Sequence, residues 1–429
     1  MTKTFFALLA VLLAGNAWSQ KIFDVRDYGA KGDGVTPDTA AIQKALNDCG
    51  KAGGGIVRFP AGTYLSQPIS LRSKTTVEVD PGATLLASTN QNDFMKDPGV
   101  WYQSKGNNFI PFIRGSDLTD VTFTGGGTID GSGSVWWGEA EKAREKVSGY
   151  TLPRPNLIVL ERCRKVRLEN ITLQNSPKFN FGPDECEDVV VTNVTILNPA
   201  RSANTDGIDP SNCKGVFITK CRIDTGDDNI AIKSGRREPG REFACEDITV
   251  TDCTFLHGHG MSIGSETSGG VGNVLVKNCV FEDTENGIRI KSQRGKGGRV
   301  ENIRYQNIRM TKVDPAVTFT CYYMYSSAKD PVQKPAPQDD AAEPMTAGTP
   351  IFRNIHISNL TATCTGGAGT IIGLPESKIS DVTFDDVKIS ATTGMKIENA
   401  AGIEFSNSLV TAAEGQAFLL KNAQVDGTK

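Results

Sequence analysis

Apolar and polar residues alternate along this chain in short runs that recur from about Val121 to the C-terminus. The recurring pattern is apolar-x-apolar-x-polar-x-x-apolar, and its polar position is commonly Asn or Asp. The clearest copies begin at Val166, Val189, Val216, Ile248, Val274 and Ile303, and weaker copies begin at Ile355, Val382 and Ile403. Alternation with a period of two, rich in Val, Ile and Thr, is typical of β-strands. Each copy therefore predicts two or three short strands separated by Gly and Asn turns.

The spacing of the copies predicts how the strands are arranged. Successive copies lie roughly 21 to 32 residues apart, with one longer gap before Ile355. Repeats of this length indicate a solenoid, whereas a propeller would need repeats of about 40 to 50 residues. Helical periodicity is absent from the region, so we expect an all-β fold, a single right-handed parallel β-helix with coils about 4.8 Å apart. The segment from Lys329 to Pro350 is rich in Pro, Ala, Asp and Gln, and we interpret it as a surface loop inserted between coils.

One short helix is expected ahead of the repeats. Thr36 can serve as its N-cap, Pro37 suits the first helical position, and Gly50 would end it. Its apolar face would consist of Ile42, Ala45, Leu46 and Cys49. The end of a β-helix exposes unpaired strands, so a helix that covers the first coil would block edge-to-edge aggregation.

The first 19 residues have the features of a secretory signal peptide. Lys3 precedes the apolar run 5–14, and Ala17 and Ser19 place small residues at positions −3 and −1 of a cleavage site. The run is about half the ~20 residues that a membrane span needs, and no later stretch is apolar enough to span. We expect residues 20–429 to form one exported β-helix domain, extracellular or periplasmic, that does not associate with a membrane and is a monomer.

The net charge and the cysteines limit which binding partners, disulfides and metal sites we expect. A formal net charge of −3 without a polybasic tail argues against nucleic acid or a membrane surface as a partner. Ten cysteines in an exported protein could form disulfides, but seven of them follow the strand register, so an interior ladder of thiols is at least as good an interpretation. Four precede a strand by three residues and three share its sixth position: Cys163, Cys186, Cys213, Cys245, and Cys221, Cys253, Cys279. No Cys-x-x-Cys is present and there are only three histidines, so no metal site is expected.

Ionisable residues recur in the turns of three successive coils. Asp227 and Asp228 follow the strand that ends at Ile223, and the preceding Thr225-Gly226 supplies a bend that can turn both carboxylates into one cleft. His259 lies at the same offset in the next coil, and Asp206 belongs to the preceding coil. Aligning the apolar residues that follow each turn brings Asp206, Asp228 and His259 level to within one residue. Crowded carboxylates have pKa values that are driven apart, which suits general acid–base catalysis, and a neighbouring imidazole can control protonation.

Two cations follow in the next coil. Arg289 and Lys291 alternate with Ile288 and Ile290, so both cations face one side while the isoleucines face the core. Lys233 is expected in the column of Lys291, one coil earlier. In a near-neutral protein this local surplus of positive charge suggests an anion site. Further cations nearby could extend it or could be ordinary charged surface: Arg236, Arg237, Arg294, Lys296 and Arg299.

Four segments in this order resemble glycoside hydrolase family 28, the polygalacturonases: Asn204-Thr205-Asp206, Gly226-Asp227-Asp228, Gly258-His259-Gly260 and Arg289-Ile290-Lys291. The opening run from Phe23 to Gly34 is similar to the start of other pectin-active β-helix proteins. Gly226 departs from the family pattern, because many relatives carry Gln there.

The resemblance implies hydrolysis of α-1,4-galacturonosyl linkages in the pectin of plant cell walls, with inversion and without a cofactor. It implies that Asp227 is the general acid, that Asp206 and Asp228 activate water, and that His259 tunes the acid. Arg289 and Lys291 would bind the galacturonate carboxylate and Asn204 would orient the cleft. An inverting pair stands roughly 6.5–9.5 Å apart, about the span of two coils.

Three alternatives remain open. A rhamnogalacturonan or xylogalacturonan hydrolase of the same family would use similar machinery. A pectate lyase on the same fold would use Ca²⁺, which the three carboxylates could bind, but it would not require His259 in that column. A non-catalytic sugar-binding β-helix would not need three crowded carboxylates. Endo and exo action, and tolerance of methyl-esterified pectin, are not distinguished by the sequence.

Overall fold

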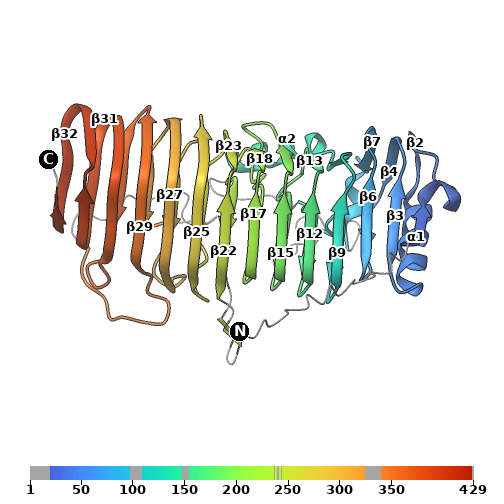
Figure 1. Cartoon of the computed structure of the whole chain (residues 1–429), viewed down its shortest axis with the longest axis horizontal. Coiled ribbons are helices and arrows are strands. Elements are labelled where there is room, and N and C mark those ends of the chain that lie inside the picture. The colour runs from blue at the N-terminus through green and yellow to red at the C-terminus, as the bar shows by residue number, and fades with distance from the viewer. Residues whose placement is uncertain are drawn as a thin grey trace, which may run out of the picture.

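The computed structural model describes residues 20–96, 109–146, 154–235, 237–238, 241–242, 244–323 and 340–427. The chain winds into a right-handed parallel β-helix whose coils stack along one long axis, from helix α1 (Thr39–Lys51) at the N-terminal end to strand β32 (Leu409–Asp426) at the other (Figure 1). The predicted all-β architecture is therefore confirmed. The predicted signal peptide, residues 1–19, and residues 329–339 of the predicted insertion lie outside the described residues.

Most coils contribute a strand to each of three parallel columns. The first column contains β1 (Ile22–Asp24), β3 (Gly55–Phe59), β6 (Thr75–Val79), β9 (Thr119–Thr124), β12 (Arg164–Glu169), β15 (Glu187–Thr192), β17 (Lys214–Thr219) and β22 (Cys245–Thr251). The second contains β2 (Asp33–Pro37), β4 (Gly62–Ser66), β7 (Ala83–Ala87), β10 (Thr128–Asp130), β13 (Thr172–Gln174), β16 (Thr195–Leu197), β18 (Arg222–Asp224) and β23 (Thr254–Leu256).

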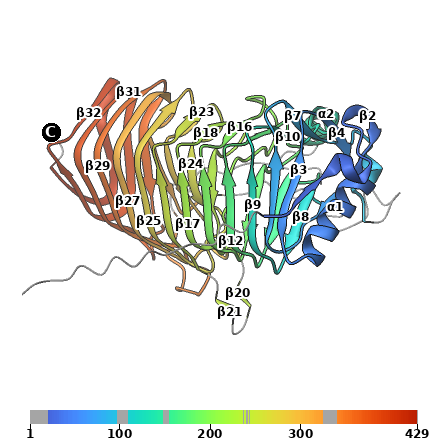
Figure 2. The same cartoon turned by 45° about the vertical axis from the view of Figure 1, so that its right-hand side comes forward.

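The third column carries the strands that matter most for function. It contains β5 (Ile69–Ser70), β8 (Ile113–Ser116), β11 (Ile158–Glu161), β14 (Phe181–Asp184), β19 (Ile230–Ile232), β24 (Met261–Gly264), β26 (Ile288–Lys291), β28 (Val317–Thr320) and β30 (Gly367–Ile372). Towards the C-terminus the first two columns merge into longer strands: β25 (Val271–Glu282), β27 (Arg299–Val313) and β29 (Ile351–Cys364). β31 (Ile379–Ser406) pairs with both β29 and β30 and so continues into the third column. A small hairpin of β20 (Arg237–Glu238) and β21 (Arg241–Glu242) projects from the stack (Figure 2).

The register of the coils follows the predicted repeat. Val166 pairs with Val189, Val189 with Val216, and Val216 with Ile248. The polar residue of the repeat marks the bend between the first two columns, where Asn170, Asn193 and other Asn and Asp residues adopt a positive φ. Asn and Asp tolerate this left-handed conformation better than other non-glycine residues. Their side chains also form ladders from coil to coil, as Asn193 Nδ2 donates to Asn170 Oδ1 at 2.7 Å.

The interior of the helix is filled by the apolar positions of the repeat. The cysteines contribute to it as free thiols, and nine of the ten are buried. Successive members of the ladder touch, since the Cys163 backbone N–H donates to Cys186 Sγ at 3.3 Å. The ladder of thiols, rather than disulfides, is therefore the arrangement in this structure.

The N-terminal helix covers the first coil as predicted, with the predicted apolar face buried (Figure 1). Its start was predicted incorrectly. Thr36 and Pro37 belong to β2, the N-cap residue is Asp38, and Gly50 lies inside the helix. The Asp38 carboxylate accepts hydrogen bonds from the Lys31 and Gly32 backbone N–H groups at 2.6 and 3.0 Å instead of capping the helix.

A second helix, α2 (Ser134–Lys146), interrupts the region in which no helical periodicity was predicted. It lies beside the early coils, and the buried Trp136 packs edge-on against Phe94 and Phe109. Its insertion accounts for the long interval between Val121 and Val166, which pair directly. The coils that precede the recognisable repeat also stack, because Thr75 pairs with Val121, in agreement with a β-helix that begins near the N-terminus. In the described part of the chain, no helix combines the length and apolar character needed to cross a bilayer.

Candidate active site

The site lies in the turns between the second and third columns. Bridges join Ile208 to Ile230 and Ile230 to Met261, and Met261 pairs with Ile288. These are the apolar residues used to align the turns, so the predicted register is confirmed. Each apolar residue is fully buried and fixes the position of the polar residues that precede it.

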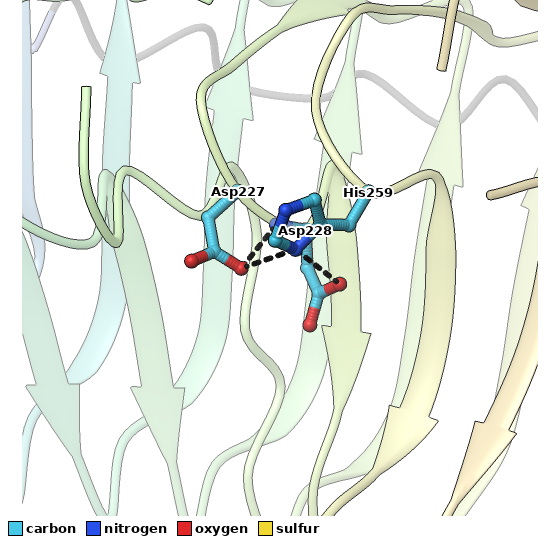
Figure 3. A group of neighbouring side chains, drawn as sticks. All are labelled: Asp227, Asp228 and His259. Carbon is cyan, nitrogen blue, oxygen red and sulfur yellow. Dashed lines mark hydrogen bonds and ion pairs between the residues drawn. The ribbon is translucent and has the colours of Figure 1, made fainter. Parts of the chain in front are cut away.

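Asp227 and His259 are in contact across adjacent coils. His259 Nδ1 lies 3.0 Å from Asp227 Oδ1 and 3.9 Å from Asp228 Oδ1, and Figure 3 shows the three side chains converging. The coils are also joined at the backbone, where the His259 N–H donates to the Asp227 carbonyl at 2.9 Å. The prediction that His259 lies beside the aspartate pair is therefore confirmed.

Two glycines permit the turns of successive coils to stack closely. A Cβ atom on Gly258, whose φ is +65°, would lie 2.3 Å from the Asp227 carbonyl oxygen. A Cβ atom on Gly226 would lie 2.2 Å from the carbonyl oxygen of Ser202. Contacts this short exclude any side chain without movement of the backbone. Gly226 therefore suits the turn of this chain.

Asp228 is the centre of a buried ion-pair network. Lys291 Nζ donates to its Oδ2 at 2.8 Å, and Arg289 Nη2 contacts its Oδ1. The hydroxyl of Ser262 donates to the same Oδ1 at 2.8 Å and accepts from Arg289 Nε at 2.8 Å. Burial alone would raise the pKa of Asp228, but the charges of Arg289 and Lys291 outweigh it and hold the pKa well below its usual range. Asp228 is therefore ionised.

This network qualifies the expectation for the two cations. Arg289 and Lys291 face away from the core isoleucines as predicted, but both are buried and paired with Asp228 rather than open to an incoming anion. Lys291 Nζ also lies 5.0 Å from the centre of the Tyr323 ring. Lys233 shares the column of Lys291, but Gly264 lies between them, so the separation is two coils rather than the predicted one.

The second oxygen of Asp227 is held by Asn204, which lies in the preceding coil. Asn204 Nδ2 donates to Asp227 Oδ2 at 3.2 Å. The buried Arg154 donates from Nη2 to Asn204 Oδ1 at 3.0 Å. A guanidinium has only donors, so Arg154 fixes the orientation of the Asn204 amide and directs its NH₂ group to Asp227. The predicted orienting position of Asn204 is consistent with this geometry.

Asp227 and His259 form an ion pair, and each changes the pKa of the other. Burial would raise the pKa of Asp227, but the charge of His259 and its hydrogen bond lower that pKa to about 2. Burial would lower the pKa of His259, but the charge and hydrogen bond of Asp227, with smaller contributions from Glu285 and Asp228, raise it to about 9. In this arrangement the proton therefore resides on the imidazole and Asp227 is ionised.

Asp206 and Asp209 have the opposite tendency. Burial raises the pKa of Asp206 well above its usual range, and the charges of Asp209 and Asp227 add to the effect. Burial also raises the pKa of Asp209 to about 7, although Lys233 opposes it from 3.7 Å. Lys233 Nζ lies 3.9 Å from Asp206 Oδ2. The carboxylates therefore do differ in pKa as expected, but the raised values belong to Asp206 and Asp209 rather than to Asp227.

The same geometry bears on metal binding. Among the described residues, one group has several potential ligand atoms within 4.8 Å of one another, namely Asp227, Asp228 and His259. Both Asp228 oxygens already bind cations, and His259 carries a proton where a metal would need a neutral imidazole. The charge balance of this group disfavours a divalent cation.

Sequence reasoning missed Asp209, Ser262 and Glu285. Asp209 ends the run that begins at Asn204, and Glu285 precedes Ile288 by the same three residues that separate Asp227 from Ile230. The column alignment could therefore have revealed Glu285. Of the further cations, Arg294 has a structural role, because it binds Glu376 at 2.7 and 2.8 Å and Asp340 at 2.8 Å and so anchors the exposed stretch after residue 340.

A parallel β-helix with carboxylates and an imidazole in successive turns, and two cations on the adjoining strand β26, is the arrangement expected of a glycoside hydrolase. The family match makes the assignment specific. A family model described as Glycosyl hydrolases family 28 matches residues 49–411, and this chain belongs to that family.

The similar proteins agree with this assignment. An endo-polygalacturonase from Pectobacterium carotovorum subsp. carotovorum is 34% identical over 377 residues, which cover 84% of this chain and 86% of the relative. The structure of a polygalacturonase from Erwinia carotovora ssp. carotovora is 32% identical with a TM-score of 0.75, over 86% of this chain and 94% of that one. A hyperthermoactive exopolygalacturonase from Thermotoga maritima is 28% identical with a TM-score of 0.73, over 95% and 90% of the two chains.

Proposed function

We propose that this glycoside hydrolase is a polygalacturonase that cleaves α-1,4-galacturonosyl linkages of pectin with inversion at the anomeric carbon. One observation carries the proposal: Asp228 joins the acid–base pair Asp227–His259 to the two cations Arg289 and Lys291. A site in which cations border crowded carboxylates suits an anionic sugar. The names of the relatives point to the same substrate.

Substrate binding would change the ion pairs of the site. A galacturonate carboxylate that reaches Arg289 and Lys291 competes with Asp228 for both cations. Loss of those partners raises the pKa of Asp228 and makes it a better proton acceptor, because opposite charges nearby had stabilised its ionised form. In the resting enzyme Asp228 would therefore be a weak proton acceptor. It would become a stronger one when the substrate carboxylate binds Arg289 and Lys291.

The proposed roles follow from these environments. Asp227 protonates the glycosidic oxygen with His259 as its proton partner, and Asn204 fixes the orientation of the carboxyl group. Asp228, with Asp206, accepts the proton of the attacking water from the opposite side of the sugar, as inversion requires. No cofactor is assigned to the reaction.

Digestion of polygalacturonate by the purified chain tests the function. We expect new reducing ends, and proton NMR of the earliest products should show the anomer opposite to that of the substrate linkage. Asp227→Asn should lower kcat by about 10²–10⁴-fold, the usual contribution of a general acid, with unfolding unchanged. An unsaturated, UV-absorbing product would instead identify a lyase, and a variant with half of the original turnover would contradict the role of Asp227.

Three narrower statements belong to the same proposal. The enzyme is exported after removal of residues 1–19, which N-terminal sequencing of the secreted protein would test. It acts as a monomer, which its mass in solution would test. Sizing of the earliest products distinguishes exo action, which releases monomers or dimers, from endo action, which releases a spread of oligomers.

A further inference from the structure

His259 is held from both sides of its ring. Its Nδ1 lies 3.0 Å from Asp227 Oδ1, and its Nε2 lies 2.9 Å from Glu285 Oε2. A ring nitrogen donates a hydrogen bond only as N–H, so an imidazole that donates to ionised carboxylates at both nitrogens carries both protons. The three side chains come from three successive coils.

The backbone determines this placement. The Glu285 N–H donates to the Gly258 carbonyl at 2.7 Å, just as the His259 N–H donates to the Asp227 carbonyl one coil earlier. Glu285 therefore occupies the column position of Asp227, two coils further along. Its side chain is 71% exposed, whereas that of His259 is 27% exposed, so Glu285 borders the solvent side of the imidazole.

We propose that Glu285 is a positioning residue for catalysis: it holds His259 doubly protonated, with Nδ1–H directed at Asp227. The proposal rests on the proposed role of Asp227 as the general acid. Because the resting proton is on the imidazole, His259 transfers it from Nδ1 to Asp227 Oδ1 as Asp227 protonates the glycosidic oxygen. The imidazole is then neutral and keeps its remaining proton on Nε2, which faces Glu285. Nδ1 regains a proton from solvent, to which Asp228 releases the proton of the attacking water, and the imidazolium is restored for the next turnover.

The charges around His259 support this role. Asp227 and Asp228 face it from the turn before β19, and Glu285 faces it from the turn before β26. The hydrogen bond from His259 is the largest cause that lowers the pKa of Glu285, and the nearby charge of Arg289 lowers it further. Glu285 therefore stays ionised at mildly acidic pH and continues to accept the Nε2 proton.

The test compares Glu285→Gln with a matched control. Gln keeps the size and the acceptor oxygen but removes the charge. We expect the alkaline limb of the kcat/KM profile to shift to lower pH by roughly half a pH unit, because the lost interaction has the strength of an exposed ion pair. KM should be nearly unchanged. Asp224→Asn is the control, because Asp224 Oδ1 lies 2.8 Å from His257 Nδ1 in an exposed pair of the same kind. The control should leave the profile unchanged.

NMR titration of the imidazoles gives a readout that does not depend on activity. The chain has three histidines, so the His259 resonance can be assigned by substitution of the other two. Its pKa should fall in Glu285→Gln, and Glu285→Asp should partly restore it. Unchanged His259 titration would overturn the inference even if the enzyme hydrolyses polygalacturonate. A rise in KM without a shift of the pH profile would also overturn it, because it would assign Glu285 to substrate contact. Absence of hydrolysis together with a normal shift in the titration would contradict the proposed function alone.

Discussion

Replacing Lys291 with Met tests whether the ion pair with Asp228 is as buried as the structure indicates. Lys291 Nζ lies 2.8 Å from Asp228 Oδ2, and the two side chains are 4% and 2% exposed. Removing one partner of a buried pair costs about 3–5 kcal/mol when the other charge is left alone. Asp228 keeps Arg289 and Ser262, so the loss should approach that of one charge-assisted hydrogen bond, about 1.5–3 kcal/mol.

Lys214→Met is the matched control. Lys214 Nζ also lies 2.8 Å from a carboxylate oxygen, that of Glu246, but its side chain is 60% exposed. The two variants therefore differ in burial rather than in distance. Urea unfolding at pH 6 should show a lower midpoint with an unchanged slope for Lys291→Met and no measurable change for Lys214→Met. Equal effects would refute the buried network.

The same variant tests substrate binding. If a galacturonate carboxylate takes over the cations, Lys291→Met should raise KM for polygalacturonate about ten- to a hundredfold, the equivalent of one charge-assisted contact. The variant should also lose preference for de-esterified over highly methylated pectin, because an ester has no charge for Lys291 to bind. A wild-type enzyme that cleaves both substrates equally well would refute the carboxylate site.

Three further predictions use the same network and the interior. The pKa of Asp209 is raised to about 7 from an unfolded value of 3.8, so the folded state binds the extra proton and stability should fall as the pH rises from about 4 to 7. The raised pKa of His259 adds a second loss between about pH 6.5 and 9. Asp209→Asn should reduce only the first slope in urea unfolding at a series of pH values, because Asp206, whose pKa is also raised, still contributes to it. An unchanged slope would contradict the burial of Asp209. All ten cysteines should react with a thiol reagent in denaturant without reductant, whereas few should react in the native protein; a smaller total would reveal disulfides. A chelator should leave hydrolysis unchanged, and a loss that Ca²⁺ reverses would contradict the charge argument against a metal.

The coil register could be predicted because its signals are local. Period-two alternation determines which side chains face the core, and Asn or Asp at the bend supports the left-handed conformation that each corner needs. Once Ile208, Ile230, Met261 and Ile288 are aligned, the neighbours of His259 follow. The same alignment of columns could also have placed Glu285 beside His259.

Protonation and pairing could not be predicted in this way. The sequence places Arg289 and Lys291 on the polar side of β26, but only the three-dimensional structure shows that Asp228 takes both as partners. It also shows that burial, rather than crowding alone, raises the pKa of Asp206. Helix α2 was missed because its apolar residues are few, and its packing depends on the distant Phe94 and Phe109.

The contacts of the site join residues that are far apart in the chain, so the stacked core must maintain them. Asp228 lies 61 residues from Arg289 and 63 from Lys291 in sequence. A single ion pair could not organise loops of that length against their conformational entropy. The buried Ile230 and Ile290 hold these residues in place instead, because each belongs to a continuous column of paired backbone and apolar side chains. Because strand side chains alternate between faces, a one-residue slip of β26 would exchange Arg289 and Lys291 with the core isoleucines. The hydrophobic pattern that folds the chain is therefore also what fixes the chemistry of its turns.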